Sequence, residues 1–132
     1  MKREAPRMQE AATLWREGAQ QALVLPHCAR CSRYVWSPRA RCVACRDALE
    51  WRGVSGRGTL VTFSVVRRAV DPALKESVPY IVAIVALDEG VRLFTNIVDA
   101  RPEALSAGMR VRCRFERTTD EAAWVPVFAP EA

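Results

Sequence analysis

Cys28-Ala-Arg-Cys31 and, ten residues later, Cys42-Val-Ala-Cys45 are the two motifs around which the first half of this chain has to fold. Each Cys-x-x-Cys turn presents two thiolates from one knuckle, and two knuckles on facing hairpins complete a tetrahedron of sulfur. The residues between the motifs contain Tyr34-Val35-Trp36 and a Ser37-Pro38 turn, which is enough chain for that hairpin. The spacing therefore predicts a structural zinc site, one per chain, with four cysteine ligands. The expected ligands are Cys28, Cys31, Cys42 and Cys45.

Other interpretations of the four cysteines stay open. A four-thiolate iron centre uses the same geometry, so the spacing does not distinguish iron from zinc. A redox pair is disfavoured, because both knuckles would have to act as independent dithiols. Catalytic zinc is disfavoured too, since four thiolates leave no open position on the metal. The site is expected to supply folding energy, because a ribbon of about 30 residues has too small a core to fold alone.

The chain divides into three expected segments: a helical segment at 1–22, the cysteine module at 23–54 and a β domain at 55–132. In the helical segment, apolar residues recur at helical spacing and form one stripe. The stripe consists of Met8, Ala12, Trp15, Ala19 and Ala22. Gly18 is the expected break or hinge. The stripe must be buried, either on the same chain or on another subunit with Trp15 as the anchor.

The β domain alternates turn signals with short apolar runs. Asp71-Pro72 and Asp88-Glu89-Gly90 are turn sequences. The run from Tyr80 to Leu87 is continuously apolar, which is typical of a strand buried on both faces. The expected strands are Thr59–Arg68, Tyr80–Leu87, Val91–Val98, Arg110–Arg117 and Trp124–Phe128. Five strands in about 75 residues predict a small closed barrel.

Length and composition narrow the function classes. The chain has 132 residues, of which 50% are hydrophobic and 27% charged, so general disorder is excluded and one domain or two very small ones are expected. No apolar run is long enough for a transmembrane helix, and the N-terminus lacks a signal-peptide pattern. The expected compartment is therefore the reducing cytoplasm, where cysteines are more often metal ligands or core thiols than disulfides.

Residues suited to catalysis are scarce. His27 is the one histidine, and we expect it to be an exposed residue of the cysteine module. The fifth cysteine, Cys113, alternates with Val111 and Phe115 on one face of a strand and is expected to be a buried core thiol. No acid–base pair, glycine-rich phosphate loop or nucleophile elbow occurs at a meaningful spacing. No catalytic residue is therefore assigned.

Arginine dominates the basic residues. The formal net charge is +5, and 18 of the 20 basic residues are arginine. The planar guanidinium fork suits phosphate groups. Nucleic acid and a nucleotide-like cofactor are therefore candidate partners, beside the simpler interpretation of a solvated basic surface.

An ordered set of motifs along nearly the whole chain resembles a known family. Besides the four cysteines, the matching stretches are Leu25-Pro26-His27, Ser37-Pro38-Arg39, Trp51, Ser55-Gly56-Arg57-Gly58-Thr59, Pro79-Tyr80, Asp88-Glu89-Gly90-Val91, Gly108-Met109-Arg110-Val111 and Pro126-Val127-Phe128. The chain is similar to small proteins that join a rubredoxin-like zinc ribbon to an OB-fold barrel. These proteins serve as accessory subunits of thiolase-superfamily enzymes. The resemblance implies a mainly β protein with an N-terminal helix, a rubredoxin-like zinc ribbon and a five-stranded OB-fold barrel.

The resemblance also implies a function. Such proteins are non-catalytic partners of a thiolase, aldolase or ketoacyl-synthase-like subunit acting on acyl-CoA, and they help to bind CoA in a hetero-oligomer. CoA carries a diphosphate and a 3′-phosphate, for which six arginines are expected contacts. They are Arg57, Arg67, Arg68, Arg110, Arg112 and Arg114.

Two other functions compete with this one. A nucleic-acid-binding protein with a zinc ribbon and an OB-fold would need exposed aromatic side chains on the barrel. Of Phe63, Phe94 and Phe115, at least two are expected on the core face. An independent enzyme or electron carrier is the third hypothesis, and iron in the four-cysteine site would then colour the protein.

Overall fold

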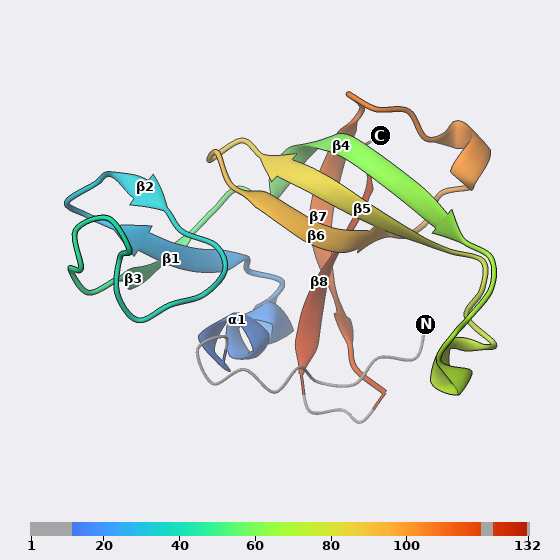
Figure 1. Ribbon diagram of the computed structural model, residues 1–132, viewed down its shortest axis with the longest axis horizontal. Coiled ribbons are helices and arrows are strands. Elements are labelled where there is room, and N and C mark those ends of the chain that lie inside the picture. The colour runs from blue at the N-terminus through green and yellow to red at the C-terminus, as the bar shows by residue number, and fades with distance from the viewer. Residues whose placement is uncertain (1–11, 120–122, 132) are drawn as a thin grey trace.

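Strands dominate the molecule, as predicted. The computed structural model describes residues 12–119 and 123–131, and within them one short α-helix and three 3-10 turns accompany eight strands (Figure 1). The helical elements are α1 (Ala12–Glu17), η2 (Gly18–Gln20), η3 (Pro72–Leu74) and η4 (Pro102–Ala104). The strands are β1 (Val24–Cys28), β2 (Arg33–Tyr34), β3 (Glu50–Gly53), β4 (Arg57–Val66), β5 (Tyr80–Leu87), β6 (Arg92–Ile97), β7 (Arg110–Arg117) and β8 (Trp124–Pro130). None of the helices described is long and apolar enough to cross a membrane.

A three-stranded sheet at one end of the long axis forms the ribbon, in the order β2-β1-β3 (Figure 1). Strand β2 folds back on β1, with Cys28 paired to Arg33, so this hairpin encloses the first cysteine knuckle. The second knuckle is closed by an isolated bridge between Arg41 and Ala48. The expected hairpin between the knuckles is therefore replaced by one hairpin at the first knuckle and a bridged loop at the second.

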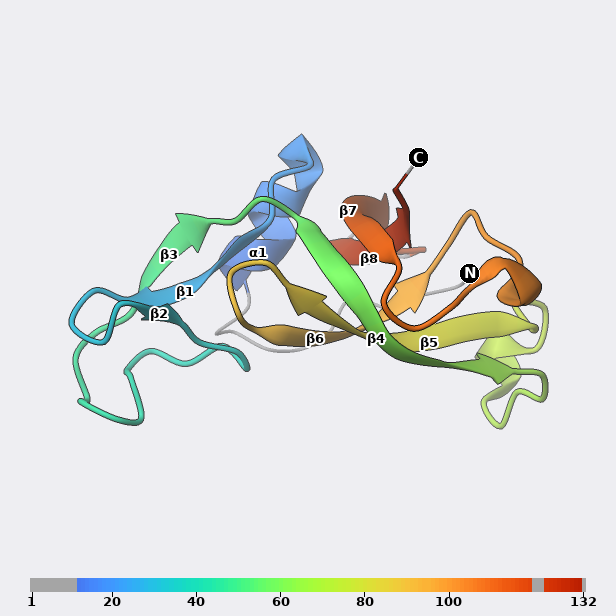
Figure 2. The ribbon, with the colours of Figure 1, turned by 90° about the horizontal axis from the view of Figure 1, so that it is seen from above.

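The other end of the molecule is a closed five-stranded barrel in the order β4-β5-β6-β8-β7. Long antiparallel ladders join most neighbours, including seven pairs between β7 and β8. The barrel closes between β6 and β8, which run parallel and share the pair Ile97 and Phe128. The predicted five-stranded OB-fold barrel is confirmed. In Figure 2, strands β4, β5 and β6 form the wall opposite α1, β7 and β8.

Strand β4 contains a bulge that its sequence pattern does not reveal. The register against β5 shifts between Leu60 and Thr62, which leaves Val61 without a partner there. Gly58 and Leu60 are therefore buried on one side of the bulge, and Phe63 packs against the core on the other. A uniform alternation along the strand was expected. An extra residue at a bulge interrupts this alternation.

Strand β5 has one core face, not two. Its buried residues alternate with half-buried ones such as Val82 and Ile84. The expectation of burial on both faces is therefore wrong, because an antiparallel barrel wall turns one face to the core and the other outward.

Helix α1 and its 3-10 extension pack on the chain's own barrel. Leu14 is 1% exposed, and Gly18 lies under Phe115, whose Cδ2 would be 2.6 Å from a Cβ at position 18. The side chain of Gln21 accepts a 2.9 Å hydrogen bond from the Phe115 amide and donates a 3.4 Å one to its carbonyl. The Gln21 side chain thus makes the two backbone hydrogen bonds at Phe115 that a neighbouring strand would otherwise make.

The predicted helical stripe is only partly within the described structure. Gly18 ends α1 as expected, but Ala19 is exposed and the buried face runs through Leu14 and Gly18. Met8 and the side chains of Ala12 and Trp15 lie outside what the structure describes. Of the predicted helical segment 1–22, residues 12–20 are helical in the structure, and residues 1–11 lie outside the described residues.

One hydrophobic cluster runs through ribbon, helix and barrel. Leu23 and Leu25 from the start of the ribbon belong to the same buried cluster as Leu60, Val85 and Phe128 of the barrel. The ribbon therefore shares its apolar packing with the barrel.

Candidate functional site

The four motif cysteines converge as predicted. Their sulfur atoms all lie within 4.8 Å of one another, with 3.5 Å between Cys28 and Cys45 and 3.9 Å between Cys31 and Cys42. Cys28 is the last residue of β1, and the backbone amide of Cys31 donates a 3.3 Å hydrogen bond to the sulfur of Cys28. This contact shapes the first knuckle so that both of its sulfurs face the second.

This arrangement fits a tetrahedral metal. Zinc–sulfur bonds of 2.3 Å in a tetrahedron place neighbouring sulfurs about 3.8 Å apart. Two of the six sulfur–sulfur separations, 3.5 and 3.9 Å, bracket this value, and none of the six exceeds 4.8 Å. Four thiolate donors suit zinc or iron, and with no fifth donor in the group they form a closed site.

The thiols also need a cation in order to ionise together. Hydrogen bonds from the backbone amides of Cys45 and Ala44 lower the pKa of Cys42 to about 6. The side chain of Cys45, above all, raises the pKa of Cys31 to about 12. Crowded thiols share protons until a divalent ion replaces them, so metal binding and proton release are coupled here.

The other two residues considered for catalysis are His27 and Cys113. Among the described residues, neither has an acid or base placed to activate it. The ring of His27 packs edge-on against Tyr34, with centroids 4.7 Å apart, and its Nδ1 lies 3.3 Å from Arg52. Cys113 is partly buried against the barrel core, and burial raises the pKa of its thiol to about 12. Its packing agrees with the expected core thiol, although its burial is incomplete.

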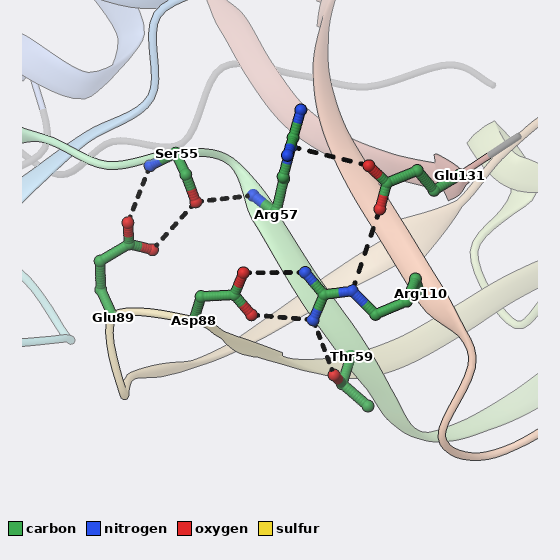
Figure 3. Close-up of polar contacts among 7 residues, drawn as sticks. All are labelled: Ser55, Arg57, Thr59, Asp88, Glu89, Arg110 and Glu131. Carbon is green, nitrogen blue, oxygen red and sulfur yellow. Dashed lines mark hydrogen bonds and ion pairs between the residues drawn. The ribbon is translucent and has the colours of Figure 1, made fainter.

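The six arginines expected to meet CoA do not form one cluster. Arg110 is held by Asp88 through two hydrogen bonds of 2.8 Å, and it donates a third, of 3.2 Å, to Thr59 (Figure 3). Glu131 lies 3.9 Å from Arg110 and 3.6 Å from Arg57. These charges neutralise one another at the end of the barrel where β4 begins.

Other members of the set lie elsewhere on the barrel. Arg114 pairs with Asp99 and, at 3.2 Å, with Glu116. Arg67 and Arg68 follow the far end of β4, roughly 30 Å from Arg57 at about 3.3 Å per residue. Within 12–119 and 123–131, no ion pair involves Arg67, Arg68 or Arg112.

A second group of arginines, which the sequence motifs did not indicate, lies on the ribbon. Arg39, Arg41 and Arg46 line a shallow pocket of about 380 Å³ together with Cys42 and Val43 of the second knuckle. Counting charge separately for each segment would have pointed to this region, because most of the positive surplus lies in residues 23–54.

Family models match the chain along most of its length. Residues 15–50 match the ChsH2 rubredoxin-like zinc ribbon domain, and residues 51–116 match the ChsH2 C-terminal OB-fold domain. The chain belongs to the ChsH2 family. The expected resemblance to proteins with a zinc ribbon and an OB-fold is thereby confirmed.

Relatives of this chain occur in several organisms. A "DUF35 domain-containing scaffold protein" of Methanocaldococcus jannaschii is 34% identical over 81% of this chain and 77% of its own length. A protein of the same name from Methanothermobacter thermautotrophicus is 33% identical over 86% of this chain and 87% of its own. A "Probable enoyl-CoA hydratase alpha subunit" of Thermomonospora curvata is 33% identical over 97% of this chain, which spans 40% of that longer protein.

A solved structure supports the same fold. A chain of the "Ltp2-ChsH2(DUF35) aldolase" superposes with a TM-score of 0.83 and is 30% identical, over 96% of this chain and 98% of that one. In this ChsH2-family chain the four cysteines of the ribbon are all present and brought together.

Proposed function

We propose that this protein is a non-catalytic accessory subunit. It would bind a catalytic subunit of the thiolase superfamily and help to hold the CoA part of an acyl-CoA substrate, with one structural zinc in its ribbon. One surface carries the proposal: the outer face of strands β4, β5 and β6, which has the composition of a protein–protein contact.

The strand register defines this outer face. Thr62, Ile84 and Phe94 form one row across the three strands, and Ser64, Val82 and Asn96 form the next. All six are uncharged, in a chain with 27% charged residues. Phe94 is 75% exposed, which is unusual for an aromatic side chain unless it meets a partner.

The opposite wall has a different character. The outward residues of β7 include Arg110, Arg112 and Arg114, two of which are held by carboxylates. The wall of β4, β5 and β6 also has an arginine, Arg92, in the row with Thr59 and Ala86. The two rows around Phe94 are uncharged, and this part of the wall is favoured as the docking side because interface cores are depleted of charge.

The relatives support an accessory role. Two are named as scaffold proteins, one as an alpha subunit of a hydratase, and the structural match is named as an aldolase of Ltp2 with ChsH2. The single histidine of this chain packs against Tyr34 beside the metal knuckle. A chain with no other histidine depends on a partner for histidine-based acid–base catalysis.

The test is co-purification from the native host with identification of the bound proteins by mass spectrometry. The tagged wild-type chain and Val70→Glu should capture a thiolase-fold protein, whereas Phe94→Glu should capture at least tenfold less. Val70 is 99% exposed in the loop after β4, so it introduces the same charge away from the docking face. If the wild-type chain captures no thiolase-fold protein, the proposal fails.

A nucleic-acid-binding function is the second candidate, because one observation favours it. Phe94 lies on the face of β5 and β6 that corresponds to the face OB-folds use for oligonucleotides, and an exposed aromatic ring can stack on a base. Phe115 is buried and Phe63 is partly buried against the core, so they offer no comparable surface. Binding of single-stranded DNA with a steep salt dependence would support this second function.

A further inference from the structure

The positive charge of the chain is concentrated in the ribbon. Residues 23–54 hold six arginines and only two acidic residues, Asp47 and Glu50. Residues 55–132 hold ten basic and ten acidic residues, so the barrel segment is neutral. A divalent ion held by four thiolates adds a charge of −2 to the ribbon, which leaves the ribbon positive. An anion site is therefore expected on the ribbon and not on the barrel.

Three of the six ribbon arginines meet at one place. Arg39, Arg41 and Arg46 line the shallow pocket beside the second knuckle, and Cys42 and Val43 form the rest of its wall. Arg41 donates a 3.1 Å hydrogen bond to the carbonyl of Arg46, which fixes one guanidinium at the pocket. Val43 is 63% exposed and gives the pocket an apolar edge.

No carboxylate lines this pocket among the described residues. The nearby Asp47 forms its ion pair with Arg30, at 3.8 Å. On the barrel, in contrast, Arg110 and Arg114 each have carboxylate partners. Three arginines therefore line the pocket with no carboxylate beside them among the described residues, and a bound anion would lower the repulsion between their positive charges.

We propose that this pocket of the ribbon binds the phosphate groups of CoA, and that the barrel arginines do not. The inference rests on the proposed function, which supplies CoA as the ligand, and it assigns the phosphates to Arg39, Arg41 and Arg46. Guanidinium forks bind phosphate oxygens in pairs, and three of them match a ligand with a diphosphate and a 3′-phosphate. The apolar edge at Val43 offers contact to the adenine ring, which is attached to the ribose that carries those phosphates.

The arginines could instead only balance the charge of the four-thiolate metal site. In that case their removal would weaken metal binding and leave no phosphate site to lose. The experiment therefore measures both quantities.

The test compares two triple variants of the full chain that remove the same charge. Arg39→Gln/Arg41→Gln/Arg46→Gln removes the arginines of the ribbon pocket. Arg67→Gln/Arg68→Gln/Arg112→Gln removes the three arginines of the expected CoA set that form no ion pair with a described residue. Isothermal titration calorimetry measures binding of CoA, of 3′,5′-ADP and of pantetheine, which has no phosphate. Elemental analysis measures the metal content of each variant.

We expect the wild-type chain to bind CoA and 3′,5′-ADP, and not pantetheine. The ribbon variant should lose at least tenfold in affinity for both phosphate ligands, and the barrel variant less than threefold. Arg39 lies outside the Cys42–Cys45 knuckle, so the single variant Arg39→Gln should keep its metal. Its affinity for both phosphate ligands should fall about threefold. This single variant decides the matter if the triple variant fails to fold.

Several results would overturn the inference. One is an equal loss of affinity for the phosphate ligands in both triple variants, and another is no binding of 3′,5′-ADP by the wild-type chain. A third is loss of metal from the ribbon triple variant without loss of its affinity for the phosphate ligands. The last is binding of a single-stranded oligonucleotide that is tighter than binding of CoA and depends steeply on salt. Capture of the thiolase-fold partner reports separately on the proposed function. A chain that captures the partner but binds no phosphate ligand overturns this inference and the CoA-binding part of the proposed function, and it leaves the accessory-subunit role standing.

Discussion

Arg110 shows how a single residue can close one end of the barrel. Its guanidinium meets Asp88 from the turn between β5 and β6, Thr59 from β4 and Glu131 from the end of the chain (Figure 3). The two-pronged hydrogen bond from Arg110 is the main cause that lowers the pKa of Asp88. The contact therefore links three segments that lie far apart in the sequence.

This contact predicts a pH-dependent loss of stability. Asp88 has a lower pKa in the folded chain than in the unfolded one, so its contribution is present above about pH 4 and is lost as the pH falls through the folded value. Asp88→Asn should therefore lower the urea midpoint slightly at pH 7, and the difference from wild type should vanish near pH 2. Urea titrations at both pH values measure this, and a difference that persists in acid would contradict the assigned cause.

Replacement of one of the four metal-binding cysteines should remove the metal and unfold the ribbon. Cys45→Ser should lower the metal content from about one ion per chain towards zero and unfold residues 24–53, because metal binding and folding are coupled. Elemental analysis and amide hydrogen exchange measure the two effects. Cys113→Ser serves as the control, since Cys113 lies in the barrel and should keep the full metal content.

Metal ligands could be predicted from sequence, but the roles of the barrel arginines could not. The Cys-x-x-Cys motifs carry their geometry locally, because both thiolates come from one turn. Arg110 and Arg114 depend instead on Asp88 and Asp99, which only the fold brings to them. Their outward alternation was visible in the sequence, whereas their neutralisation by carboxylates was not.

At the scale of elements, β4 packs tightly against β5 at Gly58. A Cβ at Gly58 would lie 2.7 Å from the carbonyl oxygen of Ala86 and 2.8 Å from Val85. The nearby bulge leaves β4 little freedom to move away, because Leu60 is fully buried directly before it. The close approach of β4 and β5 at this point therefore requires glycine.

Substitution at this position should be costly. Gly58→Ala should lower the free energy of unfolding by about 1–3 kcal/mol, because one of the two strands must shift. Gly53→Ala is the matched control, since a Cβ at Gly53 meets nothing within 4 Å, and its effect should stay within about 0.5 kcal/mol. Chemical denaturation measures both, and equal effects would mean that β4 and β5 can separate freely.

Sequence patterns placed some strands to the residue and others only approximately. Tyr80–Leu87 and Arg110–Arg117 were predicted with their observed bounds, because turn residues and sharp alternation frame them. The predicted start of β4 was two residues late, since two glycines and an arginine precede its apolar run. The bulge in β4 carries no local signal and follows from the closure of the barrel.

At the scale of the whole molecule, a short linker fixes the ribbon against the barrel. Glu89, in the turn after β5, accepts hydrogen bonds from the amide of Ser55 at 2.9 Å and from its hydroxyl at 3.4 Å (Figure 3). The Ser55 hydroxyl in turn accepts one from the amide of Arg57, at 3.2 Å. Since Leu25 of the ribbon packs in the same cluster as the barrel core, the two parts should move as one body.

Removal of this contact should loosen the joint. Glu89→Ala should speed hydrogen exchange of the Ser55 amide roughly tenfold, as expected for the loss of a hydrogen bond to a charged acceptor. Glu103→Ala, at an exposed acidic residue of η4, is the control and should leave that amide unchanged. Exchange measured by NMR on both variants tests the role of the linker, and a slow Ser55 amide in Glu89→Ala would contradict it.

The uneven placement of charge also affects how fast the protein can find a partner. A positive ribbon joined to a neutral barrel makes the molecule an electric dipole along its long axis (Figure 1). Such a molecule turns as it nears a negatively charged surface, so that collisions occur ribbon first and association is accelerated. The gain fades as salt shortens the screening length to about 8 Å at physiological ionic strength. The rate of complex formation should thus fall with added salt far more than the rate of dissociation rises.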